Sequence, residues 1–348
     1  MKAAVWTDYN QMEVREVPVP EIFDEEVLIR VMAAGVCITD LHVCSGQFAY
    51  GRPPHILGHE ISGRIEAVGA RVRHWKAGDR VVVETSIGCG RCRFCRSGQR
   101  HLCPDMTEIG FTPHNGGYAQ FVKAPAANLF AIPPSVSYEE AGILESVVCP
   151  IGALMRLGVG FEETAVVYGV GPAGLAFIQG LKLLGASKVV AVARDDFRLA
   201  RAKRFGADVT VNARTEDVLT RVLQETGGVG ADIVCEAAGA PQTIESAFQT
   251  ARNAGRVILY GIPADRDVVC LPVSMAIMKK LSIHGAAGNP QVWEPLLGAV
   301  ARGAINLKDM ITHRFSLDQI DRAFEVVRDK RENAVKAIIL PWEEGVQI

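Results

Sequence analysis

Ala165-Val166-Val167-Tyr168-Gly169-Val170-Gly171-Pro172-Ala173-Gly174 is a short apolar run followed at once by three spaced glycines. The run predicts a buried strand, and a helical pattern continues to Leu184, where Gly185 ends it. Glycines between a strand and a helix let the backbone approach a pyrophosphate, whose charge the helix N-terminus attracts. This context favours a dinucleotide site over a plain glycine-rich turn. The predicted cofactor-binding residues are Gly169, Gly171, Pro172, Ala173 and Gly174.

Strand and helix patterns continue to alternate after this motif. Lys188–Val192, Asp232–Cys235 and Arg256–Tyr260 have strand patterns, whereas Phe197–Phe205 and Thr243–Arg252 have helical ones. This alternation is typical of a doubly wound parallel sheet of the Rossmann type. We therefore predict an α/β dinucleotide-binding domain over residues 153–288.

The end of the second strand distinguishes the two common dinucleotides. An NAD site places Asp or Glu there, about twenty residues after the glycines, to bind the ribose 2′-hydroxyl. This chain instead has Ala193 and Arg194, followed by Arg198. A small residue leaves room for a 2′-phosphate, and Arg binds phosphate through charge-assisted hydrogen bonds. The sequence thus predicts NADP rather than NAD, although Asp195 or Asp196, which we interpret as helix caps, could supply the carboxylate.

A second group of chemically active residues lies near the N-terminus. The segment Gly35–His42 contains a thiol, a hydroxyl, a carboxylate and an imidazole, and Gly58-His59-Glu60 follows it. Thiolate and neutral imidazole are preferred zinc ligands, and a catalytic zinc has three protein ligands and one open position. We interpret Cys37 and His59 as two of these ligands. Thr39 and His42 would carry protons between the metal-bound oxygen and solvent.

The third ligand of this zinc is left open by the residues themselves. Glu145 and Cys149 both follow a predicted helix over Ser137–Leu144, which starts with the capping-box pair Ser137 and Glu140. Either a carboxylate oxygen or a thiolate can complete a zinc site.

Four further cysteines predict a second, structural zinc. Cys89, Cys92, Cys95 and Cys103 have the spacing C-x2-C-x2-C-x7-C. Four thiolates in one short segment form a closed tetrahedral site that stiffens the loop. A disulfide pair or an iron–sulfur cluster is the alternative, but the spacing differs from the ferredoxin types.

Composition limits the other possibilities. The 348 residues suggest roughly two domains, and a net charge of −2 argues against nucleic acid as a partner. The chain has no run of eighteen apolar residues that could span a membrane, and its start lacks the long apolar segment of a signal peptide. Nine cysteines without such a signal indicate metal ligation and free thiols, so we expect a cytoplasmic protein.

The regions flanking the predicted Rossmann domain are different. Residues 1–85 contain short strand patterns such as Val27–Val31 and Val81–Val83, separated by turn residues, which suggest a barrel-like domain. After about residue 288 the alternation fades, with helical patterns at Trp293–Ala301 and Leu317–Arg328 and a strand pattern at Val335–Leu340. We expect residues 1–152 and 289–348 to form one split domain.

Taken together, these motifs resemble the zinc-dependent medium-chain dehydrogenase/reductase family across nearly the whole chain. The segment Gly35–His42, the Gly58-His59-Glu60 triplet, the cysteine segment and Gly169–Gly174 occur in the family order. The resemblance implies a GroES-like β-rich catalytic domain and a Rossmann domain, with the active site between them. It also implies that Glu60 and Asp40 lie beside the catalytic zinc, and that subunits form dimers or tetramers through strands such as Arg256–Tyr260.

The resemblance also narrows the chemistry. Sorbitol and polyol dehydrogenases have Glu as third ligand in a run similar to Ala141–Glu145, so Glu145 is favoured and Cys149 is the reserve. The polyol branch often carries Arg-Tyr where this chain has Gly285–Asn289. That departure favours a less hydroxylated substrate, such as a diol, amino alcohol or cyclitol. Phe48, Tyr50 and Trp293 are candidate pocket residues.

The expected reaction is reversible hydride transfer between a secondary alcohol and nicotinamide. Zinc would lower the pKa of the alcohol, and the proton would leave through Thr39, the cofactor ribose and His42. The alternatives are a threonine-type amino-alcohol dehydrogenase that uses NAD, a zinc-free NADPH quinone or enone reductase of the same fold, and a non-enzymatic protein that kept the fold.

Overall fold

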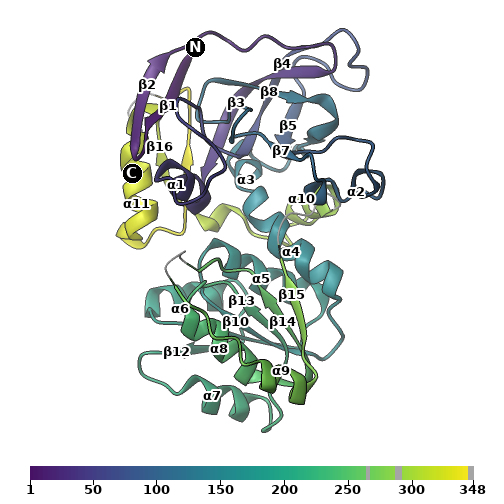
Figure 1. The fold of residues 1–348 in the computed structure, drawn as a ribbon, viewed down its shortest axis with the longest axis vertical. Helices are drawn as coiled ribbons and strands as arrows, with labels where there is room; N and C mark the ends of the chain where they lie inside the picture. The colour runs from purple at the N-terminus through teal and green to yellow at the C-terminus, as the bar shows by residue number, and fades with distance from the viewer. Residues whose placement is uncertain (264–266, 287–291, 344–348) are drawn as a thin grey trace. The chain divides into compact units, whose positions relative to one another are not determined.

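A computed structural model describes residues 1–263, 267–286 and 292–343 of the chain. It divides into two compact units: the first contains residues 1–145 together with the chain from 290 onward, and the second contains residues 146–289. Figure 1 shows the elements of both units. The predicted domain boundary at residues 152 and 153 falls inside α4 (Glu145–Leu157), which contains the division at residue 145.

The second unit is built on a parallel sheet of six strands. Their order is β12-β11-β10-β13-β14-β15, and every neighbouring pair is parallel. This is the doubly wound order in which strand sequence reverses beside the first strand, β10. The bounds are β10 (Thr164–Tyr168), β11 (Lys188–Ala193), β12 (Val209–Asn212), β13 (Ala231–Glu236), β14 (Ala251–Leu259) and β15 (Ser282–Gly285).

Helices connect these strands and pack on the sheet (Figure 1). Helix α5 starts at Pro172, whose fixed φ suits the first helical turn, and ends before Gly185, whose φ of +111° closes the helix. The glycine-bounded helix predicted from sequence is therefore confirmed. The helices are α5 (Pro172–Leu184), α6 (Asp196–Arg204), α7 (Val218–Glu225), α8 (Pro241–Thr250) and α9 (Val273–Lys279).

Several elements of this unit differ from the sequence prediction. Strand β14 starts at Ala251, directly after α8, and not at Arg256. Ala254 has a φ of +55° and the pairing with β13 shifts register, so a bulge interrupts the strand and disguises its alternation. Sequence reasoning missed β12, α7, α9 and β15, which are all short; α9 and β15 also contain no buried residue.

The first unit is β-rich, as the sequence predicts. Its main sheet has the order β16-β17-β3-β4-β5-β9, with β8 also paired to β3, while β1 and β2 form a separate ribbon. The strands are β1 (Lys2–Asp8), β2 (Gln11–Glu16), β3 (Glu26–Val36), β4 (Glu60–Val68), β5 (Arg80–Val83), β8 (Phe121–Pro125), β9 (Leu129–Ala131), β16 (Ile311–Phe315) and β17 (Lys336–Ile339). A short pair, β6 (Ser86–Ile87) and β7 (Thr107–Glu108), flanks the cysteine segment.

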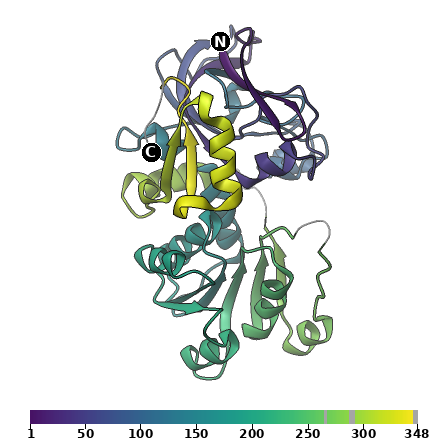
Figure 2. The same cartoon turned by 90° about the vertical axis from the view of Figure 1, so that its left-hand side faces the viewer.

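The C-terminal segment completes this first unit. Strand β17 pairs antiparallel with β3, so that Ile338 lies opposite Gly35. Helices α10 (Trp293–Ala301) and α11 (Ile320–Asp329) accompany it, and Figure 2 shows the yellow C-terminal strands beside the purple N-terminal ones. The core of this unit includes Trp6, Ile29, Phe315 and Ile339, which are completely buried.

Two helices of the first unit correct the sequence prediction. The sequence predicts metal ligands and proton carriers in Gly35–His42 but no helix there, whereas Ile38–Cys44 forms helix α1. The predicted helix Ser137–Leu144 is shorter, α3 (Tyr138–Gly142), and α4 follows after a break. The capping box of Ser137 and Glu140 is confirmed, since each contributes a side-chain hydrogen bond to the other's backbone.

Within the described ranges, each helix is too short or too polar to traverse a lipid bilayer.

Candidate functional site

The start of helix α1 brings the first candidate residues together. Cys37 occupies the N-cap position in extended conformation, and its backbone N–H donates to Asp40 Oδ2 at 3.2 Å. Thr39 lies in the first turn, with its Oγ1 3.5 Å from Cys37 Sγ. His42, one turn further along the helix, is half-buried against the ring of Phe48. These residues are close in sequence because they occupy the start of one helix, where residues three or four apart lie on the same face.

Asp40 orients the imidazole of His59. Its Oδ1 lies 3.0 Å from His59 Nδ1, and its Oδ2 accepts a hydrogen bond of 2.6 Å from the Tyr118 hydroxyl. Burial opposes ionisation of both groups. The His59 charge nevertheless holds the pKa of Asp40 below its ordinary value, and Asp40 raises the pKa of His59. Because Nδ1 is occupied by the carboxylate, Nε2 is the nitrogen left to bind a metal.

Three potential ligand atoms converge here, one of them from the His59 imidazole. Cys37, His59 and Glu60 each place one ligand atom within 4.8 Å of the others, and thiolate, imidazole and carboxylate suit zinc. Glu145 Oε2 lies 4.0 Å from His59 Nε2, so the favoured third ligand is also near this centre. Cys149 is buried one turn further along α4. The structure thus brings Cys37, His59 and Glu60 into one group, with Glu145 at its margin.

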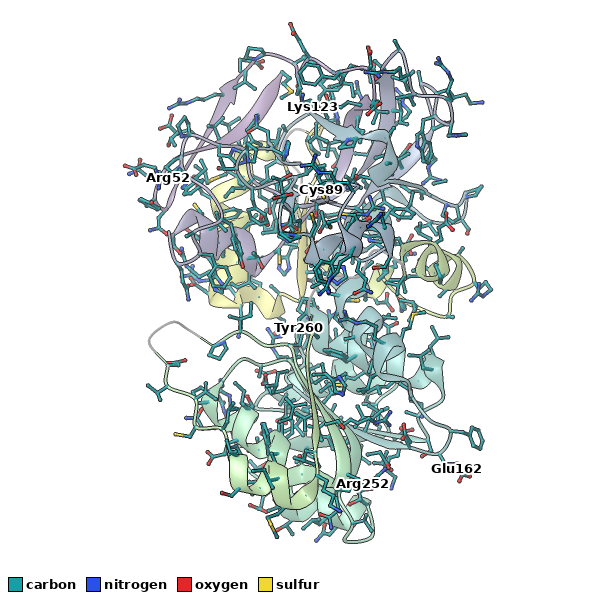
Figure 3. All side chains as sticks on the ribbon, turned by 45° about the vertical axis from the view of Figure 1, so that its right-hand side comes forward. Arg52, Cys89, Lys123, Glu162, Arg252 and Tyr260 are labelled. Carbon is teal, nitrogen blue, oxygen red and sulfur yellow. The ribbon has the colours of Figure 1, made fainter. Side chains whose placement is uncertain are left out.

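The four cysteines of the predicted structural site also converge. Cys89, Cys92, Cys95 and Cys103 place their sulfur atoms within 4.8 Å of one another, and none forms a disulfide. Backbone N–H groups of Cys89, Cys92 and Cys95 each donate to a sulfur of this group at 3.4 Å. Cys89 is labelled in Figure 3. The arrangement fits a closed tetrahedral zinc.

The glycines of the nucleotide motif satisfy three different constraints. Gly169 has a φ of +86°, which disfavours other residues. A Cβ at Gly174 would lie 1.9 Å from the Gly169 carbonyl oxygen, so close packing requires glycine there. A Cβ at Gly171 would meet nothing within 4 Å, so this position, at the N-cap of α5, faces open space. An open glycine at a helix N-terminus is suited to the approach of a phosphate.

The residues after β11 have distinct roles. Ala193 ends the strand and Arg194 is exposed, which leaves the expected 2′-phosphate position accessible. Arg198 instead reaches the glycine turn, where its Nη1 donates to the Val170 carbonyl at 3.1 Å. Asp195 Oδ1 accepts from the Arg198 backbone N–H at 3.1 Å and caps α6, as the sequence predicts. Asp196 accepts from the Asn212 amide.

A row of aromatic rings lies beside the zinc-ligand group. Phe48 contacts His42, Tyr50 contacts Phe48 and Phe111, and Phe111 lies 5.1 Å from the His59 ring. Tyr50 is 59% exposed, so part of this row is accessible to a ligand. Trp293, the third pocket candidate, is instead 2% exposed and stacks on Phe130 as a core residue. The segment Gly285–Asn289, where the sequence departs from the polyol branch, lies largely outside the described residues, which exclude 287–289.

Three residues of this centre are missed by sequence reasoning. Tyr118 binds Asp40, Phe111 packs on His59, and Lys336 forms a buried ion pair with Glu60. No sequence motif links these three residues to the predicted zinc ligands, because contacts between distant parts of the chain bring them to the centre. The one available signal is the Lys in the otherwise apolar strand Val335–Leu340.

Comparisons with known proteins agree with both parts of the chain. Residues 24–134 match the alcohol dehydrogenase GroES-like domain, and residues 172–302 match the zinc-binding dehydrogenase domain. The chain is 33% identical to sorbitol dehydrogenase of Bacillus subtilis, covering 98% of this chain and 97% of the relative. It is 36% identical to L-threonine 3-dehydrogenase of the same organism, covering 94% of each.

A solved structure extends this likeness to three dimensions. A dehydrogenase from Sinorhizobium meliloti 1021, determined bound to NADP, has a TM-score of 0.92 and 29% identity. The alignment covers 98% of this chain and 99% of that one.

Glu84 connects the cysteine segment to the main sheet. It is buried, and Arg100 Nη2 lies 3.2 Å from its Oε2 without forming a hydrogen bond. Burial raises the pKa of Glu84 from an ordinary 4.5 to about 7, and the Arg100 charge offsets only part of that effect. The folded protein therefore keeps a proton on Glu84 at pH values where the unfolded chain has lost it.

We expect the stability of the wild type relative to Glu84→Gln to fall as pH rises. Because the folded protein holds the Glu84 proton more tightly, the free energy of unfolding falls as pH rises from the unfolded to the folded pKa of Glu84. At pH values above neutrality this loss reaches roughly 3 kcal/mol. Urea unfolding of both proteins from about pH 5 to about pH 8 measures it. Glu21→Gln, at an exposed position, controls for removing a carboxylate, and a difference that stays constant with pH would contradict the assignment.

Proposed function

Because this chain belongs to the zinc-dependent medium-chain dehydrogenase/reductase family and is therefore an oxidoreductase, we propose that it transfers a hydride between NADP(H) and a secondary alcohol or ketone. The observation that carries the proposal is the convergence of Cys37, His59 and Glu60 within 4.8 Å, with His59 held by Asp40. A zinc-free quinone or enone reductase would not need this group together with four clustered cysteines.

The residues of the first unit would hold the metal and move the proton. Cys37 and His59 would bind a zinc, with Glu145 as third ligand and Glu60 beside it. Zinc, when bound there, supplies a Lewis acid that lowers the pKa of an alcohol. Thr39 and His42 lie one turn apart on α1, so their side chains would carry the proton toward solvent. The cysteine segment would hold a second, structural zinc.

The residues of the second unit would hold the dinucleotide. Gly169, Gly171, Pro172, Ala173 and Gly174 would bind the pyrophosphate at the start of α5. Ala193 and Arg194 would accommodate a 2′-phosphate. The proposal of NADP over NAD is supported by the absence of an acidic residue at position 193 and by the NADP found in the Sinorhizobium structure. Arg198 would support the glycine turn through its bond to Val170.

We propose a polyol, diol, cyclitol or related sugar alcohol as substrate. The likeness to sorbitol dehydrogenase and the position of Glu145 support this class. The aromatic row of Phe48, Tyr50 and Phe111 offers apolar faces and a single hydroxyl, which suits a small or cyclic substrate. A threonine-type amino alcohol used with NAD is the second candidate, favoured by the likeness to L-threonine 3-dehydrogenase.

We also propose a cytoplasmic homo-oligomer, a dimer or tetramer. All nine cysteines are free, as in a reducing compartment. The strand first predicted for the interface, Arg256–Tyr260, belongs to β14, which is paired on both sides and so has no free edge for a second copy. One of the two edges of the sheet is β15, beside an apolar groove of about 310 Å³ that includes Leu271, Val273, Ile277 and Ile283. An exposed edge strand beside an apolar groove favours pairing with a second copy.

Replacing Cys37 by Ser should remove one of two zinc ions per subunit and abolish turnover, while NADPH binding persists. Cys44→Ala is the matched control: it lies in the same helix, but burial raises the pKa of its thiol to about 11 and it should keep both ions. Metal analysis, NADPH fluorescence titration and an assay with polyols and diols measure these effects. Full turnover in a Cys37→Ser protein that has lost its zinc would refute the proposal.

Ala193→Asp should weaken NADPH binding by about a hundredfold, because the new carboxylate repels the 2′-phosphate, and should strengthen NADH binding. Arg194→Ala should weaken NADPH alone. Arg204→Ala, at the opposite end of α6, serves as the control for a lost positive charge. Equal binding of both dinucleotides by all these variants would show that this strand end does not select the cofactor.

Ile283→Asp should dissociate the oligomer, because it places a charge on the exposed edge of β15, where Ile283 is 46% exposed. Val229→Asp, at a 65% exposed position away from this edge, should leave the assembly unchanged. Light scattering after size exclusion measures the mass. A wild type that is monomeric at micromolar concentration would rule out the interface.

A further inference from the structure

A buried carboxylate lies at the carboxyl end of strand β13, whose last residue is Glu236. Glu236 is completely buried, and in strand register it lies between Tyr168, the last residue of β10, and Leu259, the last residue of β14. Strand order reverses between β10 and β13, and doubly wound sheets bind ligands at the carboxyl ends of the strands beside that reversal. The sheet therefore places Glu236 at the edge where a ligand binds.

The carboxylate accepts hydrogen bonds from the loop that follows its own strand. Backbone N–H groups of Ala238 and Gly239 donate to Oε1 at 2.9 and 3.0 Å. The hydroxyl of Thr243, in the first turn of α8, donates to the same oxygen at 2.7 Å. Burying a carboxylate is costly unless its oxygens find donors, and these three groups offset that cost. The side chain of Glu236 thus fixes the loop between β13 and α8 to the end of the strand.

The second oxygen of this carboxylate faces the loop that follows β14. Oε2 accepts from the Gly239 N–H at 3.3 Å, and the Gly261 N–H donates to the main-chain carbonyl of Glu236 at 3.0 Å. A Cβ on Gly261 would lie 2.8 Å from Oε2 and 2.2 Å from the Gly239 nitrogen, so no side chain fits there. The two loops therefore meet backbone to backbone beside one carboxylate, which joins the loop after β13 to the loop after β14.

The loop held by Glu236 also borders the glycine turn that we propose for the pyrophosphate. A Cβ on Gly169 would lie 2.9 Å from the backbone nitrogen of Ala238, so the two segments are in close contact. The adenosine half of the dinucleotide is assigned to the end of β11, and β11 and β13 lie on opposite sides of β10. The loops after β13 and β14 are therefore left for the nicotinamide half.

We propose that Glu236 is a positioning residue that holds these two loops together as the binding surface for the nicotinamide half of the dinucleotide. The inference rests on the proposed function, since the chain must bind a dinucleotide at the glycine turn. The donors to the carboxylate are the chain's own N–H and O–H groups, so Glu236 acts through the loops and not by contact with the ligand.

The test compares Glu236→Gln with the wild type, using NADPH and adenosine 2′,5′-bisphosphate, which carries the adenosine half alone. Either orientation of the new amide turns its amino group toward backbone N–H donors, so the two loops should separate. We expect NADPH binding, measured by fluorescence titration, to weaken about tenfold, whereas bisphosphate binding, measured by calorimetry, changes by less than about twofold. Glu225→Gln removes a carboxylate that pairs with Lys188 at the amino end of β11 and should leave both affinities unchanged.

A purely structural role for Glu236 predicts a different result. If the substitution merely loosened the whole unit, both affinities would fall together, and that outcome or unchanged NADPH binding would overturn the proposal. If Glu236→Gln does not fold, Thr243→Val is used in its place, because it removes one donor and leaves the carboxylate. NADPH binding should then weaken about threefold with bisphosphate binding unchanged, and equal NADPH affinities of Thr243→Val and the wild type would overturn the proposal.

Failure of the proposed function gives a separate result. A wild type that binds neither NADPH nor NADH has no dinucleotide site, and the role of Glu236 falls with it. A wild type that prefers NADH is tested in the same way with NADH and adenosine diphosphate, so the choice of cofactor does not decide the role of Glu236.

Discussion

The bond between Asp40 and His59 is the interaction on which the metal centre depends. One carboxylate, fully buried, joins helix α1, the turn before β4 and the ring of Tyr118. In such a low-dielectric place a carboxylate is tolerated only when its lone pairs are used, and here both oxygens have partners. The same contacts fix which nitrogen of His59 faces the ligand group. The geometry of the centre thus follows from satisfying one buried charge.

Much of this architecture is encoded in short stretches of sequence. The strand, glycines and helix around Gly169–Gly174 are local signals, since each depends on neighbours within one turn or strand. The ligand group is likewise predictable in part: Cys37 and His59 are near each other, and four cysteines converge as their spacing indicates. Residue type and spacing suffice where a site is built from a helix start and an adjoining strand.

The features that escape prediction depend on distant parts of the chain or on weak periodicity. Lys336 and Tyr118 reach the centre through strand pairing and hydrogen bonds that span many residues, and nothing near them in sequence announces it. The bond from Arg198 to the carbonyl of Val170 also has no local signal, and the sequence predicts for Arg198 only a role at the phosphate. Strand β14 is predicted too short because Ala254 breaks its alternation. Such details are decided by tertiary packing rather than by local preference.

The placement of β17 beside β3 has a consequence for biosynthesis. The ribosome synthesises the chain from its N-terminus. β3, β4 and the cysteine segment therefore emerge before β17, the strand that pairs with β3, has been made. The second unit has all its strands between residues 146 and 289 and can complete its sheet earlier. The first unit must wait for β17, since contacts between remote segments form late and slowly. The nascent protein therefore carries an unclosed sheet edge until β17 has been translated.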